Sequence, residues 1–449
     1  MSGDFEFYKN EADEISKCKA DALTSIKQKR FDTIATHGTY NLAEAMRNNG
    51  SIIEPVYMST AQVFRDSNEL EAALSYQIPS WSYSRINNPS IYYLESTLAL
   101  LEGYQCNLET SCCVTASGMS AIVTVVDALL ADNIDANFIS SSQVYGGSFQ
   151  QFSVRQKQKS HNVRWVYPSA PIEEWEAQID GNTRFIYIET PTNPSLALCD
   201  ISALAALAHQ YGIPLVVDST LATPALLRPF AFGADIVIHS LSKTITASGV
   251  SIGGAIISKK DITANFLTRE ETADFATYLK LLPNRDNGAC LSPLQAFLTL
   301  SELRTIRTRI NHLSQTTEKV VGFLELHANV EKVYYPGSTQ HEQHDLAKSL
   351  FKLVDAPNIN RYGHLVSFTI KGGLNETKQI LSSFNLIFRA TDLGRIKSVA
   401  TIPAISTHQQ QGDKGRDLAG IPNNLIRLCA GAEHPQDIID DLEQALNVV

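Results

Sequence analysis

Ile236-Val237-Ile238-His239-Ser240-Leu241-Ser242-Lys243-Thr244 is the stretch of this 449-residue chain that most strongly constrains its fold. The apolar residues at its start are typical of a buried strand. Lys243 follows that strand with a hydroxyl side chain on either side. A lysine in this position is usually a solvated turn residue, but it can also form a Schiff base with an aldehyde cofactor whose phosphate the hydroxyls hold.

A second strand-like run, Ile213-Pro214-Leu215-Val216-Val217, ends directly before Asp218. An isolated Asp at a strand end is usually a turn or cap residue. A carboxylate there can also pair with a protonated pyridine nitrogen, which keeps the ring of pyridoxal phosphate an electron sink. Because ligands bind at the carboxyl ends of the strands of open α/β sheets, Asp218 and Lys243 together predict pyridoxal 5'-phosphate as the cofactor.

Composition and charge narrow the class of protein. A chain of this length with 44% hydrophobic residues is typical of a globular enzyme with two or three domains. The net charge of -10 argues against nucleic acids and anionic membranes, so we expect a small-molecule partner. The seven cysteines have no CxxC or framework spacing, and no apolar run has signal or membrane-spanning length. These features predict a cytoplasmic protein.

Strand-like and helical patterns alternate through the middle of the chain. Strand-like runs at 138–140, 163–167 and 185–188 alternate with helical patterns at 117–129 and 200–212. This is the order of βαβ units, and it predicts an α/β fold with a mostly parallel, doubly wound sheet.

The chain is expected to have three parts. Residues 1–88 have few strand-like runs, so we expect an N-terminal arm with one or two helices that contacts a neighbouring subunit. Residues 89–294 form the predicted large domain, in which the pattern changes to helices after Gly253-Gly254. Residues 295–449 form a smaller α+β domain. Its expected elements are strands at 365–370 and 425–429 and a terminal helix at 435–446.

Several polar residues can complete a cofactor site. Ser117-Gly118-Met119 lies at a predicted helix start, where free N–H groups bind anions, although a lone Ser-Gly is more often a plain N-cap. Ser240 and Ser242 add hydroxyl donors for a phosphate. Tyr145 precedes Gly146-Gly147 and can stack on the cofactor or serve as an acid or base.

Two further residues have functional interpretations beside ordinary ones. Asn193, in an Asn-Pro pair that otherwise indicates a turn, can donate to the ring oxygen of the cofactor. Arg427 lies in the apolar run 425–428, where a charge is costly unless it binds a carboxylate such as that of an amino-acid substrate.

From about Arg30 onward, the chain resembles the transsulfuration family of cystathionine synthases, methionine lyases and acetylhomoserine sulfhydrylases. The matching segments are Tyr83-Ser84-Arg85-Ile86-Asn87-Asn88-Pro89, Ala116-Ser117-Gly118-Met119-Ser120-Ala121-Ile122, Tyr145-Gly146-Gly147, Glu189-Thr190-Pro191-Thr192-Asn193-Pro194, Val217-Asp218-Ser219-Thr220, Gly233-Ala234-Asp235 and the Lys243 segment. The resemblance implies fold type I, the aspartate-aminotransferase fold, with pyridoxal phosphate.

The resemblance also implies roles for these residues. Lys243 would bond to the cofactor, Asp218 would pair with its ring nitrogen, and Arg427 would bind the substrate carboxylate. Tyr83 and Arg85 would reach the phosphate in a neighbouring subunit, so that a dimer is the smallest active unit and a homotetramer is expected. The implied phosphate ligands are Ser117, Gly118, Met119, Ser240 and Ser242.

The resemblance accounts for one segment that has a metal-like composition. His341 and His344 lie near Glu342 and Asp345, but Tyr335-Pro336-Gly337 and this stretch resemble a structural segment of the family. Too few further ligands have recognisable spacing, so no metal site is predicted.

Departures from the family pattern bear on the substrate. Gly147 stands where dedicated methionine lyases have cysteine, and Thr391 stands where cystathionine-handling members have glutamate. Asp392 replaces a serine in the predicted substrate site, which puts the usual carboxylate-binding geometry in doubt. Ser406-Thr407-His408-Gln409-Gln410 resembles the acetylhomoserine sulfhydrylase branch. Arg395 and Lys397 can either bind an anionic group at the distal end of the substrate or lie in solvent.

These observations predict gamma replacement on an activated homoserine, with Tyr145 assisting proton transfer and the natural leaving group and nucleophile left open. The alternative is a gamma-lyase that yields a 2-oxo acid and ammonia. An aminotransferase and a non-catalytic homologue are further alternatives.

Overall fold

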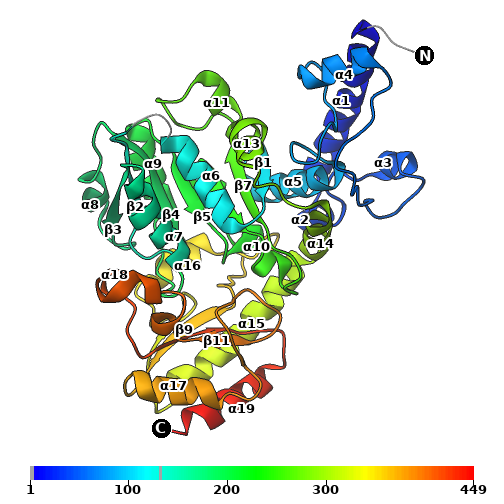
Figure 1. Cartoon of the computed structure of the whole chain (residues 1–449). Helices are drawn as coiled ribbons and strands as arrows, with labels where there is room; N and C mark the ends of the chain where they lie inside the picture. Colours follow the sequence, from blue (N-terminus) through cyan, green and yellow to red (C-terminus); the bar gives the residue numbers. More distant parts are fainter. Residues whose placement is uncertain (1–4, 131–133) are drawn as a thin grey trace.

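A seven-stranded sheet forms the centre of the larger domain in the computed structural model, which describes residues 5–130 and 134–449 (Figure 1). β7 runs antiparallel to both of its neighbours, and the other neighbouring pairs are parallel. The expected mostly parallel sheet is therefore confirmed. In spatial order the strands are β1 (Thr110–Thr115), β7 (Gly254–Lys259), β6 (Ile236–Ser240), β5 (Leu215–Asp218), β4 (Thr183–Glu189), β2 (Asn137–Ser141) and β3 (Asn162–Val166).

Two strands of this sheet differ from the sequence expectation. The change to helices expected after Gly253-Gly254 comes only after one further strand, β7, which begins at Gly254. The pattern does not predict β1 either. A short apolar run such as Ala255-Ile256-Ile257 fits a buried strand and a buried helix equally well. Pairing with β1 on one side and β6 on the other decides the matter in favour of a strand.

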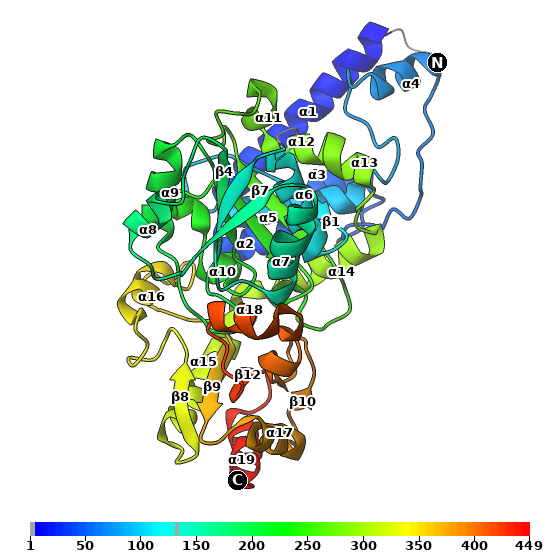
Figure 2. The same ribbon diagram turned by 60° about the vertical axis from the view of Figure 1, so that its left-hand side comes forward.

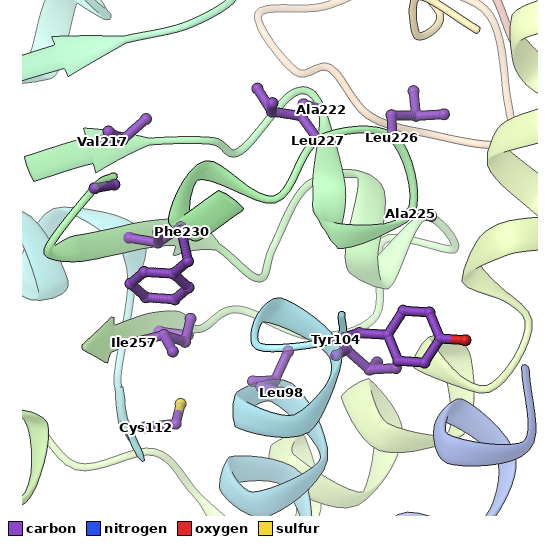
Figure 3. Close-up of a cluster of buried hydrophobic side chains, with 14 of the residues drawn as sticks. Leu98, Tyr104, Cys112, Val217, Ala222, Ala225, Leu226, Leu227, Phe230 and Ile257 are labelled. Carbon is purple, nitrogen blue, oxygen red and sulfur yellow. The ribbon is translucent and has the colours of Figure 1, made fainter. Parts of the chain in front are cut away.

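Alternate residues of the central strands face two separate cores. In β5, Leu215 and Val217 belong to one core and Val216 belongs to the other. Figure 3 shows part of the first core, where Leu98 lies on the same side of the sheet as Val217 and Ile257. The first core includes α5 (Pro89–Glu102) and α9 (Ile201–Gln210), and the second includes α6 (Gly118–Leu130). Helices thus cover both faces, as in a doubly wound fold.

The smaller domain contains a five-stranded sheet. In spatial order its strands are β10 (Phe388–Arg389), β11 (Val399–Thr401), β12 (Leu425–Cys429), β9 (Leu365–Ile370) and β8 (Val330–Tyr334). Its core is completed by α15 (Ile306–Leu326), α17 (Leu374–Ser383) and α19 (Pro435–Leu446). The expected strands 365–370 and 425–429 and the terminal helix 435–446 are confirmed at these bounds.

An N-terminal arm precedes the larger domain. Its helices are α1 (Phe5–Lys27), α2 (Phe31–His37), α3 (Leu42–Arg47) and α4 (Ser67–Leu74), and α1 and α4 project from the body of the molecule (Figure 1). More helices form than the expected one or two, because side-chain caps on Asn41 and Asp66 start helices too short to show a clear apolar period. Ile52 and Val63 are almost fully exposed.

The remaining helices connect these parts. They are α7 (Gly146–Gln150), α8 (Ile172–Glu176), α10 (Thr223–Leu226), α11 (Arg269–Ala273), α12 (Phe275–Leu279), α13 (Arg285–Asn287), α14 (Pro293–Leu303), α16 (His344–Leu350) and α18 (Gly412–Leu418). Short 3-10 and π segments are η1 (Gln151–Gln156), η2 (Pro229–Phe232), η3 (Thr244–Thr246), η4 (Lys280–Asn284), η5 (Pro403–Ile405) and η6 (Gln409–Gln411). Among the helices of residues 5–130 and 134–449, none has the length and apolar character needed to cross a bilayer.

α14 packs in the core of the larger domain through Ala296, Leu300 and Leu303, together with the start of α15. The predicted divisions after residues 88 and 294 remain predictions. Residues 1–4 of the predicted arm and 131–133 of the predicted large domain lie outside the described residues.

Candidate active site

A cavity of about 820 Å³ lies at the carboxyl ends of β4, β5 and β6. The smaller domain closes it with the turn 391–395, the segment 406–411 and one residue of β12. Figure 2 shows α18, which follows that segment, at the junction of the two domains. The sequence-predicted residues that line the cavity are Ser117, Gly118, Met119, Tyr145, Asn193, Asp218, Ser240, Ser242, Lys243, Asp392 and Arg427.

One end of the cavity has the properties of an anion site. The helix α6 begins at Gly118, and the first N–H groups of a helix have no acceptor within it. A Cβ atom at Gly118 would lie 2.7 Å from the Cβ of Ser240, so only glycine allows this approach of helix and strand. Ser242 lies in the same wall, and its hydroxyl accepts from the Gly253 N–H at 3.0 Å. Free N–H groups with two serine hydroxyls suit a phosphate.

Asp218 is a buried anion that faces the cavity. Its Oδ1 accepts from the N–H of Thr220 at 3.0 Å, and the hydroxyl of Tyr187 lies 3.3 Å from its Oδ2. Burial raises the pKa of Asp218. Within the described part of the chain, no lysine or arginine forms an ion pair with it. A cationic ring nitrogen in the cavity would supply the missing partner.

Glu189 has a positioning role that the sequence did not indicate. It ends β4 beside Asp218 in the parallel register of β4 and β5. Its two carboxylate oxygens accept from the N–H groups of Tyr145 and Asn193, each at 2.8 Å. Burial, followed by the charge of Asp218, raises the pKa of Glu189. The matching end positions of two neighbouring strand-like runs are the signal that could have found it.

Lys243 ends in an ion pair with Asp392, whose Oδ1 lies 2.8 Å from Nζ. Arg395 donates to the other oxygen of Asp392 from its Nε. Burial acts to raise the pKa of Asp392, but the hydrogen bonds from Lys243 and Arg395 outweigh it and hold that pKa below its usual value. Of the two basic residues flagged near this turn, Arg395 therefore belongs to the cavity, while Lys397 lies over the ring of Phe388.

Arg427 is a buried cation that lines the same cavity as Asp218. Its side chain, in a residue only 1% exposed, donates to Oδ1 of Asn193 at 3.1 Å and to the carbonyls of Thr391 and Asp392 at 2.9 Å. All three acceptors are uncharged. Burial lowers the pKa of Arg427 to about 10. A substrate carboxylate would supply the counter-charge that no described side chain gives this guanidinium.

Tyr145 lies over Gly147, where a Cβ atom would come within 2.5 Å of the tyrosine ring. Beside it, Gly146 packs so closely on the carbonyl of Thr407 that a side chain could not fit. His408 is buried, and burial followed by the charge of Arg427 lowers its pKa to about 4. These contacts bring the segment 406–411 against the start of α7.

The wall formed by 406–411 contains a residue that sequence reasoning missed. Both polar atoms of the Gln411 carboxamide are buried and have no hydrogen-bond partner among the described residues. Gln411 lines the cavity with Gln150, Ser406, Thr407 and Gln410, none of which is charged. Only the fold could reveal it, since nothing in the local sequence distinguishes Gln411 from the two preceding glutamines.

Tyr83 and Arg85 do not line the cavity of their own chain. Arg85 donates to the carbonyl of Arg285 at 2.6 Å, and its guanidinium lies 5.4 Å from the centre of the Tyr83 ring. The role predicted for them, at the phosphate of a neighbouring subunit, remains a prediction.

The histidine-rich segment makes local contacts. Nδ1 of His344 lies 2.9 Å from the carbonyl oxygen of Pro336, and Nδ1 of His341 accepts from the N–H of Gln343. Across 5–130 and 134–449, no group of three or more His, Cys, Asp or Glu is arranged to hold a metal ion.

The donor set fits pyridoxal phosphate: one cavity holds an anion site, a buried carboxylate without a lysine or arginine partner among the described residues, and a lysine. Residues 32–447 match the model of the Cys/Met metabolism PLP-dependent enzymes. The chain is 31% identical to an L-methionine gamma-lyase of Fusobacterium nucleatum over 402 residues, which cover 89% of this chain and 94% of the lyase. It is also 31% identical to a homocysteine synthase of Schizosaccharomyces pombe, covering 94% of this chain and 99% of the synthase.

A solved structure supports the same family assignment. A candidate O-acetylhomoserine (thiol)-lyase of Campylobacter jejuni, which carries a pyridoxyl-lysine phosphate, superposes with a TM-score of 0.85 at 31% identity, covering 93% of this chain and 100% of that one. These likenesses confirm fold type I and the family resemblance of the sequence. The chain belongs to the Cys/Met metabolism PLP-dependent enzymes, and pyridoxal phosphate is its cofactor.

Proposed function

We propose that this enzyme catalyses gamma replacement on an activated homoserine. The observation that carries the proposal is that one cavity holds Lys243 together with a buried anion, Asp218, and a buried cation, Arg427. Neither buried charge has an ion-pair partner among the described residues. The ring nitrogen of the cofactor and the carboxylate of an amino acid match these two charges. When bound, pyridoxal phosphate supplies an electron sink for negative charge at the substrate carbons.

The side chains of the cavity have distinct proposed roles. Lys243 binds the cofactor and, once the substrate has displaced it, takes the proton from the α carbon and then serves at the β carbon. Asp218 keeps the ring nitrogen charged, and Arg427 orients the substrate by its carboxylate. Tyr145, which lines the cavity, assists proton transfer at the departing group. The proposed phosphate ligands are Ser117, Gly118, Met119, Ser240 and Ser242, and Asn193 is proposed to donate to the ring oxygen.

The distal wall of the cavity favours an uncharged leaving group. Thr391 offers no carboxylate to a distal ammonium, and the charge of Arg395 is already paired with Asp392. The wall of Gln150, Ser406, Thr407, Gln410 and Gln411 is polar and neutral, and the free amide of Gln411 can donate to an ester carbonyl. An acyl ester of homoserine fits this wall. In replacement, the Cγ–O bond breaks, the acid leaves as its carboxylate, and a nucleophile bonds to Cγ.

A gamma-lyase is the second candidate. The observation in its favour is the sequence identity to the L-methionine gamma-lyase of Fusobacterium nucleatum. At 31%, it equals the identity to the homocysteine synthase. Gly147 argues against a dedicated methionine lyase, because it stands where those enzymes carry cysteine.

We also propose that the arm places Tyr83 and Arg85 in a neighbouring subunit's site, within a homotetramer. Neither side chain lines the cavity of its own chain, and the arm carries exposed apolar residues such as Ile52 and Val63. A cytoplasmic location is in keeping with seven free thiols.

The test uses the purified enzyme and O-acetylhomoserine, with and without sulfide. We expect a thiol amino acid and acetate whose rate of formation depends on sulfide. Ammonia and 2-oxobutanoate formed at the same rate with and without sulfide would reject replacement and support the lyase.

A further inference from the structure

The turn that carries Asp392 packs directly on the backbone around Lys243. Gly394 has a φ of +79°, and a Cβ atom there would lie 2.6 Å from the N of Thr244. The N–H of Ile396 donates to the carbonyl of Ala247 at 3.1 Å. The smaller domain is therefore fixed against the lysine segment by backbone contacts that do not involve the carboxylate of Asp392.

The two oxygens of the Asp392 carboxylate accept hydrogen bonds from two different cations. One oxygen accepts from Nζ of Lys243 at 2.8 Å and from the N–H of Leu393 at 2.9 Å. The other accepts from Nε of Arg395, whose Nη1 donates to the carbonyl of Thr246 at 3.0 Å. Arg395 thus holds Asp392 in place and competes with Lys243 for its charge.

We propose that Asp392 is a positioning residue that holds the amine of Lys243 whenever that amine is not bonded to the cofactor. The inference rests on the proposed role of Lys243 as the cofactor lysine. In the ion pair the lysine is an ammonium, whose nitrogen has no free electron pair. Lys243 must therefore leave Asp392 and release a proton to solvent before its nitrogen bonds to the aldehyde carbon, with the aldehyde oxygen leaving as water.

In this arrangement, Asp392 and the cofactor compete for the amine of Lys243. The ion pair stabilises the cofactor-free state, and it also gives the amine a defined position after the substrate has displaced it. Arg395 weakens the hold of Asp392 on Lys243 by sharing its charge. Removing the carboxylate and removing the arginine should therefore change cofactor affinity in opposite directions, which general damage to the site would not do.

The test is the dissociation constant of pyridoxal phosphate, measured by dialysing full-length holoenzyme to equilibrium at neutral pH. Asp392→Asn, which keeps the shape of the side chain, should bind the cofactor roughly twofold to fivefold more tightly, the range expected for a partly exposed ion pair. Arg395→Gln should bind it more weakly. The matched control is Asp413→Asn, since Asp413 pairs with Arg416 at the same spacing outside the cavity.

Opposite shifts in Asp392→Asn and Arg395→Gln, with Asp413→Asn at the wild-type value, support the proposal. Equal affinity in Asp392→Asn and wild type, or shifts in the same direction, overturns it. If Asp392→Asn does not fold, Asp392→Ser carries the same expectation. Borohydride reduction and peptide mapping distinguish failure of the proposed site from failure of the role of Asp392. An adduct on a residue other than Lys243 refutes the proposed site. An adduct on Lys243 with unchanged cofactor affinity in the variants refutes only the role of Asp392.

Discussion

Nη1 of Arg427 lies 3.1 Å from Oδ1 of Asn193, so a guanidinium of the smaller domain donates directly to an amide of the larger one where both line the cavity. The guanidinium is buried, and its acceptors among the described residues are all uncharged. Such a group gains its counter-charge when a carboxylate arrives, which makes substrate capture depend on it.

Arg427→Ala should therefore act mainly on substrate capture. We expect kcat/KM to fall by a factor equivalent to roughly 2 to 5 kcal/mol, mostly through a higher KM, because the variant leaves the substrate carboxylate unpaired. Steady-state kinetics with O-acetylhomoserine measures this. Arg389→Ala, in the exposed strand β10 of the same sheet, is the matched control. An unchanged KM in Arg427→Ala would show that the residue is structural.

Lys243→Ala should abolish both turnover and covalent attachment of the cofactor, since the nitrogen that forms the bond is lost. The measurement is the visible absorption of the protein, followed by mass spectrometry after borohydride reduction. Lys348→Ala, which removes a lysine on the exposed surface of α16, should keep the absorption and the adduct. A reduced adduct in Lys243→Ala would show that another lysine bonds to the cofactor.

Asp218→Asn should lower kcat strongly while the protein still takes up the cofactor. A neutral amide does not hold a protonated ring nitrogen, so the electron sink is weakened, at a cost of roughly 2 to 5 kcal/mol in the barrier. Single-turnover rates at saturating substrate give the value. Asp200→Asn, at the N-cap of α9, is the control, because asparagine caps a helix as well as aspartate does. Wild-type rates in Asp218→Asn would exclude the proposed pairing.

The pKa values of the buried carboxylates predict a pH dependence of stability without cofactor. Burial raises the pKa of both Asp218 and Glu189, so the folded chain holds their protons more tightly than the unfolded one. Their stabilising contribution is present below the ordinary carboxyl pKa of about 4 and is lost as pH rises through the raised values. Thermal unfolding of the cofactor-free chain across that range measures it. Asp218→Asn should flatten the dependence, and an equally steep slope in the variant would contradict this assignment.

His408 should give stability a pH dependence of the opposite sign. Burial lowers its pKa to about 4, so protonation favours the unfolded chain, and stability is lost as pH falls from about 6.5 toward that value. His408→Asn should remove part of this acid sensitivity, on the order of 1 to 3 kcal/mol in the free energy of unfolding. Denaturant titrations at several pH values would detect it. The exposed residue His434 offers a control, and equal acid sensitivity in His408→Asn and wild type would exclude His408 as a source.

Gln411→Glu should change which ester the enzyme accepts. A carboxylate in this wall repels a distal carboxylate, so kcat/KM for O-succinylhomoserine should fall at least about tenfold relative to that for O-acetylhomoserine. The ratio of the two values is the measurement, because it cancels effects on folding and cofactor binding. Gln409→Glu, a neighbour in η6 that does not line the cavity, is the control. An unaltered ratio would exclude Gln411 from contact with the leaving group.

The sequence was sufficient to predict the features that local chemistry determines. Lys243 and Asp218 stand at the ends of apolar runs that form β6 and β5, and the edge at which such strands end follows from the βαβ order. The strand β7 was missed because its short apolar run has no distinguishing period and is defined by its two neighbours. Gln411 and the ion pair of Asp392 depend on how two domains meet, and residues separated by 149 positions carry no local signal of contact.

Within one chain, the cavity divides its tasks between separate segments. The proposed contacts to the cofactor come from the larger domain, and those to the distal part of the substrate come mainly from residues 391–411 of the smaller one. Descendants of one ancestral gene could therefore acquire new leaving groups through mutations in this short interval alone. The vitamin-dependent chemistry would be inherited unchanged, and selectivity would be the freely evolving trait.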